Sequence, residues 1–283
     1  MTATKQKTAL AVHDISCVGK CSLTVALPIL SAAGIETSVL PTSVLSTHTG
    51  GFEGYTFHDL TSEIDPITRH WESLGLTFDA IYTGYLGSRE QVTLMAALFD
   101  RFGKNALKLV DPVMADNGAL YGGFASDFPQ AMKTLCAKAD VIVPNFTEAA
   151  LMLGEPYVEG PYPKDYIEGL LHRLTAVCPG KIVLTGVFFD DTAVGAASYD
   201  PASGQVDYAL APRVPGYFHG TGDVFGSALL ASLLAGQPLA RSIQIAADFT
   251  ADSIRKSDPD REKKYGVRFE AALPGLMKAL GIM

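Results

Sequence analysis

Two kinds of apolar pattern alternate along the chain. Short continuous apolar runs, typical of buried strands, are separated by longer segments in which apolar residues recur every three or four positions, as on an amphipathic helix. The expected strands are Thr8–His13, Ile35–Leu40, Asp79–Tyr85, Leu107–Val110, Val141–Val143 and Lys181–Thr185, with a hairpin of Ala193–Tyr199 and Gln205–Leu210. The expected helices are Ser22–Ala33, Asp59–Leu74, Ser88–Phe102, Ser126–Lys138, Lys164–Val177, Thr221–Ala235, Leu239–Ser257 and Phe269–Leu280.

This alternation predicts an α/β fold with a mostly parallel central sheet and helices on both faces. No Ser/Gly-rich linker divides the chain, so we expect residues 1–283 to form a single domain. In such sheets ligands bind beyond the carboxyl ends of the strands. The positions expected there are Asp14, Thr49, Tyr85, Asp111, Asn145, Thr185 and the loop before Thr221.

Composition and charge exclude several classes of protein. The 283 residues are 48% apolar and carry 22 basic and 30 acidic side chains, a net charge of −8, which is typical of a globular protein without a broad nucleic-acid surface. The apolar stretches Ala9–Val12 and Val224–Ala235 are too short for a secretory signal and for a membrane span, so we expect a cytoplasmic protein. The scattered cysteines lack zinc-site spacing and are expected to be buried free thiols: Cys17, Cys21, Cys136 and Cys178.

The strongest chemical signal is the segment His219–Phe225, which opens an apolar helix. Its glycines let successive backbone N–H groups point the same way, and a helix N-terminus adds unpaired donors. The segment therefore predicts an anion hole at Gly220, Thr221 and Gly222. Asp223 follows in the first turn, where it could accept a proton. An ordinary helix cap is the alternative, but a carboxylate beside an anion site favours catalysis.

Two further motifs follow expected strands. Asp111 and Asp116, five residues apart in a loop, suit a magnesium ion or a phosphate-bound metal, although turn formation explains them as well. Asn145 and Glu148 would share one face of a starting helix, where a capping box is the equally good alternative. The polar loop Ser46–Gly51 could hold a small polar ligand.

The segment Cys17–Ser22 is similar to the end of a phosphate-binding P-loop. That motif requires Gly where this chain has Asp14, and Ser or Thr where it has Cys21. The sequence therefore excludes a P-loop, and it contains no dinucleotide-binding glycine fingerprint.

Together the Gly-Thr-Gly-Asp, Asn-x-x-Glu and Asp-Pro-Val-Met motifs resemble the ribokinase-like superfamily. Within it, Leu45–Gly50 and Tyr82–Tyr85 resemble segments of the pyridoxal/pyridoxamine kinase branch. The resemblance runs from about Leu10 to at least Leu234. It implies a three-layer α/β/α fold and a homodimer.

The resemblance further implies ATP-dependent phosphorylation of the 5′-hydroxymethyl group of a vitamin B6 vitamer. Asp223 would be the base, with Gly220, Thr221 and Gly222 as the anion hole. Magnesium would lie with Asp111 and Glu148. The implied ATP contacts are Asp116, Asn145, Thr185, Val214, Phe218 and Gly220. The implied vitamer contacts are Asp14, Ser16, His48, Thr49 and Tyr85.

Two positions depart from the family pattern. Asp14 lies in the loop where the family often has a ring-contacting Ser, and its carboxylate would favour the cationic amine of pyridoxamine. Val143 replaces a common Thr, which weighs against a monovalent cation such as K⁺ beside the Mg²⁺ of ATP. A hydroxymethylpyrimidine kinase, a ribokinase-type carbohydrate kinase and a non-catalytic nucleotide- or B6-binding protein remain alternatives.

Overall fold

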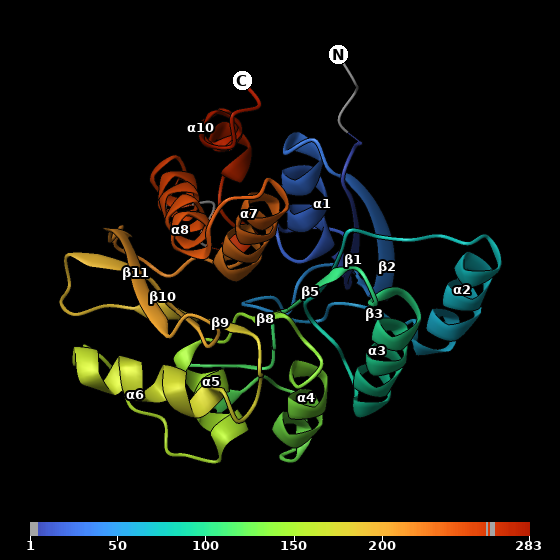
Figure 1. The fold of residues 1–283 in the computed structure, drawn as a ribbon, viewed down its shortest axis with the longest axis horizontal. Coiled ribbons are helices and arrows are strands. Elements are labelled where there is room, and N and C mark those ends of the chain that lie inside the picture. Colours follow the sequence, from blue (N-terminus) through green and yellow to red (C-terminus); the bar gives the residue numbers. More distant parts are fainter. Residues whose placement is uncertain (1–4, 259, 261–263) are drawn as a thin grey trace.

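The computed structural model describes residues 5–258, 260 and 264–283. Within them one nine-stranded sheet has the order β11-β10-β9-β8-β5-β4-β1-β2-β3 (Figure 1). Its strands are β1 (Thr8–Ser16), β2 (Glu36–Leu45), β3 (Phe57–Asp59), β4 (Ala80–Thr83), β5 (Leu107–Val110), β8 (Val141–Ile142), β9 (Lys181–Val187), β10 (Ala193–Asp200) and β11 (Gln205–Pro212). The strands from β2 to β9 pair in parallel, and antiparallel partners lie only at the two edges, so the expected mostly parallel sheet is confirmed.

Helices cover both faces of the sheet. One layer contains α1 (Leu23–Ala32), α7 (Thr221–Leu234), α8 (Leu239–Arg255), the 3₁₀ turn η1 (Phe269–Ala271) and α10 (Leu273–Ala279). The other contains α2 (Thr61–Ser73), α3 (Arg89–Phe102), α4 (Phe128–Cys136), α5 (Phe146–Leu153) and α6 (Lys164–Leu174). In Figure 1 α1, α7, α8 and α10 lie above the sheet and α3 to α6 below it. The expected three-layer α/β/α fold is confirmed.

Alternation along the strands produces two separate cores. On β1, Leu10 and Val12 pack into the core under α2 to α6, while Ala9 packs into the core under α1, α7 and α8. On β4, Ile81 and Tyr82 divide between the cores in the same way. Successive side chains of a strand point to opposite faces, so a fully covered strand is apolar on both.

Some expected boundaries were wrong. β1 continues to Ser16, so Asp14 lies inside a strand rather than after one, because a register shift between His13 and Ile15 lets the pairing with β2 resume. Thr185 likewise lies inside β9, which runs to Val187. β4 ends at Thr83, which leaves Tyr85 beyond the strand.

The sequence pattern also missed short elements. The start of a helix at Asn145, where α5 begins, was expected, but β3 was not, nor was the small ladder formed by β6 (Ala115–Asp116) and β7 (Ala119–Leu120). Elements of two or three residues contain less than one period of any hydrophobic pattern, so only tertiary pairing reveals them. The expected helix Phe269–Leu280 is divided into η1 and α10, with a proline in the first turn of α10.

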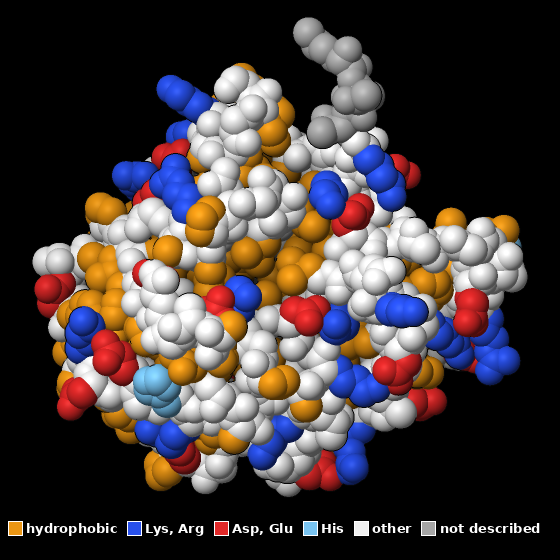
Figure 2. All heavy atoms as spheres, viewed as in Figure 1, with side chains coloured by type: hydrophobic (Ala, Val, Ile, Leu, Met, Phe, Trp, Pro, Cys, Tyr) orange, Lys and Arg blue, Asp and Glu red, His pale blue; other side chains and the backbone are white. Residues whose placement is uncertain are grey.

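The expectation that all four thiols are buried was wrong. Cys136 and Cys178 are buried, but Cys17 is exposed and Cys21 is half-buried, because the turn after β1 lies at the surface. Among the described residues, no helix is both long and apolar enough to cross a membrane. Acidic and basic side chains are interspersed on the face that Figure 2 shows. The expectation of no signal segment falls partly on residues 1–4, outside the described residues.

Candidate active site

Four carboxylates that are far apart in the sequence lie close together in the structure. Asp111 interacts electrostatically with Glu148 and with Asp223, and Asp223 interacts with Asp14. They come from the loop after β5, from α5, from α7 and from β1. The parallel strands bring these groups to one edge of the sheet, as the order of the elements predicts.

A tight turn precedes the first residue of α7. Gly220 has φ +77°, and a Cβ there would overlap the carbonyl oxygen of Lys20, so only glycine fits. The first helical hydrogen bond joins the N–H of Val224 to the carbonyl of Gly220 at 3.1 Å, and no side chain caps the helix among the described residues. The first three amides of α7 therefore lack helical partners, and Gly222 borders open space. The turn can bind an anion.

Asp223 lies in the first turn of α7, beside these amides. The backbone N–H of Ser22 donates a hydrogen bond to its carboxylate. Burial nevertheless raises the carboxyl pKa to about 7, and the negative charge of Asp14 acts in the same direction. A base whose pKa lies near neutral pH is well suited to accept a proton from an alcohol.

Asp111 and Glu148 are buried, 7% and 3% exposed. Burial raises the pKa of Glu148 to about 8, although its carboxylate accepts N–H bonds from Asn145 at 2.9 Å and from Met114 at 3.2 Å. Burial also raises the pKa of Asp111, and the charges of Glu148 and Asp223 add to the effect. Among the described residues no Lys or Arg offsets these charges.

This uncompensated charge suits a divalent cation. Among the described residues, no group of three or more His, Cys, Asp or Glu is arranged to hold a metal alone. Magnesium commonly takes one or two carboxylates and completes its shell with water and substrate phosphates. Asp111 and Glu148 therefore fit an ion that arrives with a nucleotide.

Asn145 and Glu148 form a complete capping box at the start of α5. The side chain of Asn145 accepts the N–H of Glu148 at 2.9 Å, and the Glu148 side chain accepts the N–H of Asn145. The Asn145 amide also donates to the carbonyl of Ala115 at 2.8 Å, which ties α5 to the Asp111 loop. The capping box is thus present and accounts for both side chains without a ligand. A contact of Asn145 with ATP stays a prediction.

The other expected nucleotide contacts occupy different environments. Asp116 is half-buried and accepts a hydrogen bond from the Tyr217 hydroxyl at 3.1 Å. The Thr185 hydroxyl donates to a backbone carbonyl at 3.4 Å. Val214 is half-buried in the loop after β11, whereas Phe218 packs into the core with α7 and α8. Their contacts with a nucleotide stay predictions.

On the expected vitamer side, Asp14 and Ser16 lie together on β1. The Ser16 hydroxyl donates to Asp14 at 3.0 Å, while burial raises the carboxyl pKa. Burial also raises the pKa of Tyr85 to about 12, with a contribution from the charge of Asp14. The Tyr85 ring lies 5.6 Å from that of Phe124, and Thr49 is exposed. Asp14 and Tyr85 thus combine a charge with an aromatic face.

His48 is buried and engaged on both ring nitrogens. Its Nε2 lies 2.7 Å from the carbonyl oxygen of Lys264, and its Nδ1 accepts the N–H of Gly50 at 3.1 Å. Its ring centroid lies 5.0 Å from that of His219. In this arrangement the ring joins the Ser46–Gly51 loop to the chain near Lys264, and a vitamer contact of His48 stays a prediction.

The sequence analysis missed two residues of this site. Ser22 has φ +56°; its backbone N–H donates to Asp223 and its hydroxyl is hydrogen-bonded to Asp14. The thiol of Cys21 lies within the electrostatic influence of the same two carboxylates, which raise its pKa together with burial. Both belong to Cys17–Ser22, which fails the P-loop pattern. Its place directly after the first strand is the signal that could have identified them.

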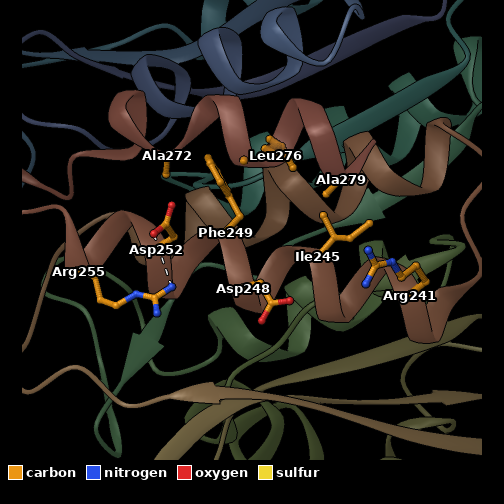
Figure 3. A pocket seen from close by; sticks show the side chains of 10 residues that line it. Arg241, Ile245, Asp248, Phe249, Asp252, Arg255, Ala272, Leu276 and Ala279 are labelled. Carbon is orange, nitrogen blue, oxygen red and sulfur yellow. Dashed lines mark ion pairs between the residues drawn. The ribbon is translucent and has the colours of Figure 1, made fainter. Parts of the chain in front are cut away.

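A groove between α8 and α10 lies apart from these groups. Figure 3 shows Phe249, Ile245 and Leu276 in the groove, with an Arg255–Asp252 ion pair of 3.5 Å at one end. None of its lining residues belongs to the candidate site.

Comparisons with known proteins point to one family. The phosphomethylpyrimidine kinase family model matches residues 31–267. A Bacteroides thetaiotaomicron structure with pyridoxal, assigned as a phosphomethylpyrimidine kinase, is 36% identical, covers 96% of each chain and has a TM-score of 0.91. Lactobacillus plantarum pyridoxal kinase is 34% identical, with a TM-score of 0.89 over 96% of this chain and 97% of the other.

A curated relative agrees with these matches. The pyridoxine/pyridoxal/pyridoxamine kinase of Bordetella avium is 27% identical over 81% of this chain and 78% of its own length. The expected resemblance to pyridoxal kinases is confirmed. The chain therefore belongs to the phosphomethylpyrimidine kinase family, within the ribokinase-like superfamily.

Proposed function

We propose that this chain is an ATP-dependent kinase that phosphorylates the 5′-hydroxymethyl group of a vitamin B6 vitamer. The observation that carries the proposal is Asp223, a carboxyl with a pKa near 7 beside the open amides of α7. A base next to an anion hole matches the two requirements of phosphoryl transfer to an alcohol.

The reaction follows from the positions of these groups. The vitamer hydroxyl oxygen bonds to the γ-phosphorus, the bond between that phosphorus and the β,γ-bridging oxygen breaks, and ADP leaves. Asp223 accepts the hydroxyl proton, and the amides at Thr221 and Gly222 stabilise charge on the transferred group. Asp111 and Glu148 would hold Mg²⁺, which supplies positive charge for the phosphates when it is bound.

Asp14 makes pyridoxamine the favoured vitamer. Its carboxylate lies near Tyr85, whose aromatic ring suits a flat pyridine. The aminomethyl group of pyridoxamine is cationic at neutral pH, whereas the corresponding groups of pyridoxine and pyridoxal are not. A charged hydrogen bond would therefore distinguish this substrate from the other two.

A second candidate is hydroxymethylpyrimidine kinase activity. The family model itself is described by phosphomethylpyrimidine kinase. Hydroxymethylpyrimidine is also a small flat ring with a hydroxymethyl group and an amine, so the same groups could accept it.

A coupled ADP-release assay separates the candidates. Purified protein with MgATP is given pyridoxamine, pyridoxal, pyridoxine, hydroxymethylpyrimidine or ribose, each as the only acceptor. We expect the highest kcat/KM with pyridoxamine. Turnover of hydroxymethylpyrimidine or ribose alone would contradict the proposal, and absence of turnover with every acceptor would favour a binding protein.

Replacing the base tests the mechanism. Asp223→Asn keeps the size of the side chain but cannot accept the proton, so we expect kcat to fall by about 10²–10⁴. Nucleotide binding measured by calorimetry should change little, because the backbone amides remain. Wild-type turnover by this variant would exclude Asp223 as the base.

A further inference from the structure

Tyr82 is a buried tyrosine directly beneath the candidate site. Its side chain is 0% exposed and belongs to the core under α7, where its ring packs edge-on against His13 with 4.4 Å between centroids. Among the described residues its hydroxyl makes no hydrogen bond of normal geometry, although the Ser227 hydroxyl lies close enough to influence it. A poorly paired buried hydroxyl is unfavourable, and phenylalanine would fill the same space without it.

The hydroxyl is seated on a glycine of α7. A Cβ built on Gly226 would overlap the Tyr82 hydroxyl oxygen and would lie 3.1 Å from Cζ of the ring. Glycine is unfavourable inside a helix, and here it permits this close approach. Gly226 comes three residues after Asp223, so both lie on the same side of the helix.

Two other observations connect Tyr82 with the reacting groups. The charges of Asp111 and Asp223 both act on the Tyr82 hydroxyl and, with burial, raise its pKa. The neighbouring Ser227 hydroxyl donates to the backbone carbonyl of Asp223 at 2.6 Å, so this turn of α7 is tightly bound together. A displacement at Gly226 would therefore be transmitted to Asp223.

We infer that Tyr82 is a positioning residue: its hydroxyl, seated on Gly226, sets the distance of α7 from the sheet and thereby holds Asp223 opposite Asp111. This inference rests on the proposed function, in which Asp223 is the base. Tyr82 acts only by positioning α7 and does not touch the substrate. Tyr82 and Gly226 match in size: the hydroxyl oxygen of Tyr82 occupies the space that a Cβ methyl group at position 226 would need. We call this relation the size match.

A pair of complementary substitutions tests the match. Gly226→Ala adds a methyl group against the hydroxyl and should lower kcat by roughly 10–100-fold, because small misplacements of catalytic groups are costly. Tyr82→Phe removes the overlapping oxygen, so Tyr82→Phe combined with Gly226→Ala should recover most of the lost kcat. The KM for the vitamer should change by less than about threefold throughout, because Asp14 and Tyr85 lie outside α7.

Tyr208→Phe is the matched control. Its hydroxyl bonds to Glu168 at 3.2 Å, away from the candidate site, and its loss should leave kcat unchanged. Thermal unfolding of every variant establishes that it is folded at the assay temperature, so that kcat refers to native enzyme. If the double variant is as slow as Gly226→Ala, the size match is wrong. A proportional rise in KM with unchanged kcat would also overturn the inference.

Crystal structures separate this inference from the proposed function. In Gly226→Ala the N-terminus of α7 and Asp223 should be displaced relative to Asp111, and the double variant should restore the wild-type distance. This readout needs no turnover. If the wild-type enzyme phosphorylates no vitamer, the proposed function fails, whereas an unmoved Asp223 in Gly226→Ala overturns the role of Tyr82.

Discussion

At the scale of single residues, burial without an ion pair sets the chemistry of the site. Asp111, Glu148 and Asp223 each have a raised pKa, and burial is the largest cause for all three. Lys and Arg are abundant on the surface, but among the described residues none pairs with these carboxyls. The site is therefore prepared to take up protons or cations, which is what the proposed magnesium-dependent phosphoryl transfer requires.

Asp14 should determine the choice of vitamer. Asp14→Asn preserves the size of the side chain but removes its charge, so we expect KM to rise about 10-fold or more for pyridoxamine and little for pyridoxine. Steady-state kinetics with both vitamers measure the difference. Ser16→Ala, which removes only the hydroxyl bonded to Asp14, serves as the comparison. It should change the KM for pyridoxamine and the KM for pyridoxine by the same factor. Equal losses in Asp14→Asn would remove the charge argument.

His13 should make the protein sensitive to acid. Its ring is fully buried, and burial lowers its pKa to about 3. In the unfolded chain His13 takes up a proton as the pH falls below 6.5, whereas in the folded protein its ring stays neutral until the pH approaches 3. The stability that depends on the neutral ring is therefore complete above pH 6.5 and is lost as the pH falls toward 3. His13→Phe should remove about 2 kcal/mol of the stability change between pH 6.5 and 5.

Urea unfolding at several pH values measures this effect. The buried carboxyls with raised pKa values change stability with pH in the opposite direction to His13. The quantity to compare is therefore the slope of unfolding free energy against pH in the variant and in the wild type. The exposed His58 is the control, and His58→Gln should retain the wild-type slope. An unchanged slope in His13→Phe would contradict the prediction.

At the scale of elements, α7 is the central part of the site. It is buried from Val224 to Ser232 and packs on α1 and α8, so its first turn is held in place by the core rather than by a cap. Its apolar sequence made the helix predictable. The sequence at the start of α5 is compatible with both a capping box and a binding role, and the capping box is present. The β6–β7 ladder has no such signal, because its pairing joins residues with no periodic pattern.

Two glycines of the anion turn should respond differently to alanine. Gly220→Ala introduces a Cβ against the Lys20 carbonyl at a positive φ, so we expect a loss of roughly 2–4 kcal/mol of stability. Gly222→Ala meets no protein atom within 4 Å and should keep or slightly raise the stability. Its methyl group should still lower kcat by entering the anion space.

Differential scanning calorimetry and the ADP-release assay give both quantities. A stable, fully active Gly222→Ala would show that no anion binds at this turn. A Gly220→Ala protein as stable as wild type would contradict the assigned backbone constraint.

At the scale of the whole molecule, the net charge is −8, while the proposed substrate ATP is itself a polyanion. The proposed answer is local: helix amides and a cation held by Asp111 and Glu148. The mixed surface charges in Figure 2 offer no broad positive surface on that face. Nucleotide binding should therefore depend strongly on the metal.

Removing magnesium tests this dependence. With Mg²⁺, saturating ATP should raise Tm by several °C, about 2–4 kcal/mol of stabilisation, and EDTA should abolish most of the shift. Asp111→Asn should weaken the response while raising the stability of the ligand-free protein, because it relieves repulsion with Glu148 and Asp223. An ATP-dependent shift unaffected by EDTA would exclude these carboxylates as the metal site.

The sequence by itself determined the alternating elements, the mostly parallel sheet, the Gly-Thr-Gly-Asp turn and the polar residues after the strands. These features are local, because periodicity and turn chemistry involve residues that are neighbours in the chain. The tertiary structure alone decided that Ser22 and Cys21 join the site, that Tyr82 meets Gly226, and that the carboxyl pKa values are raised. Those properties depend on burial and on contacts between distant segments, which exist only after both helical layers have packed on the sheet.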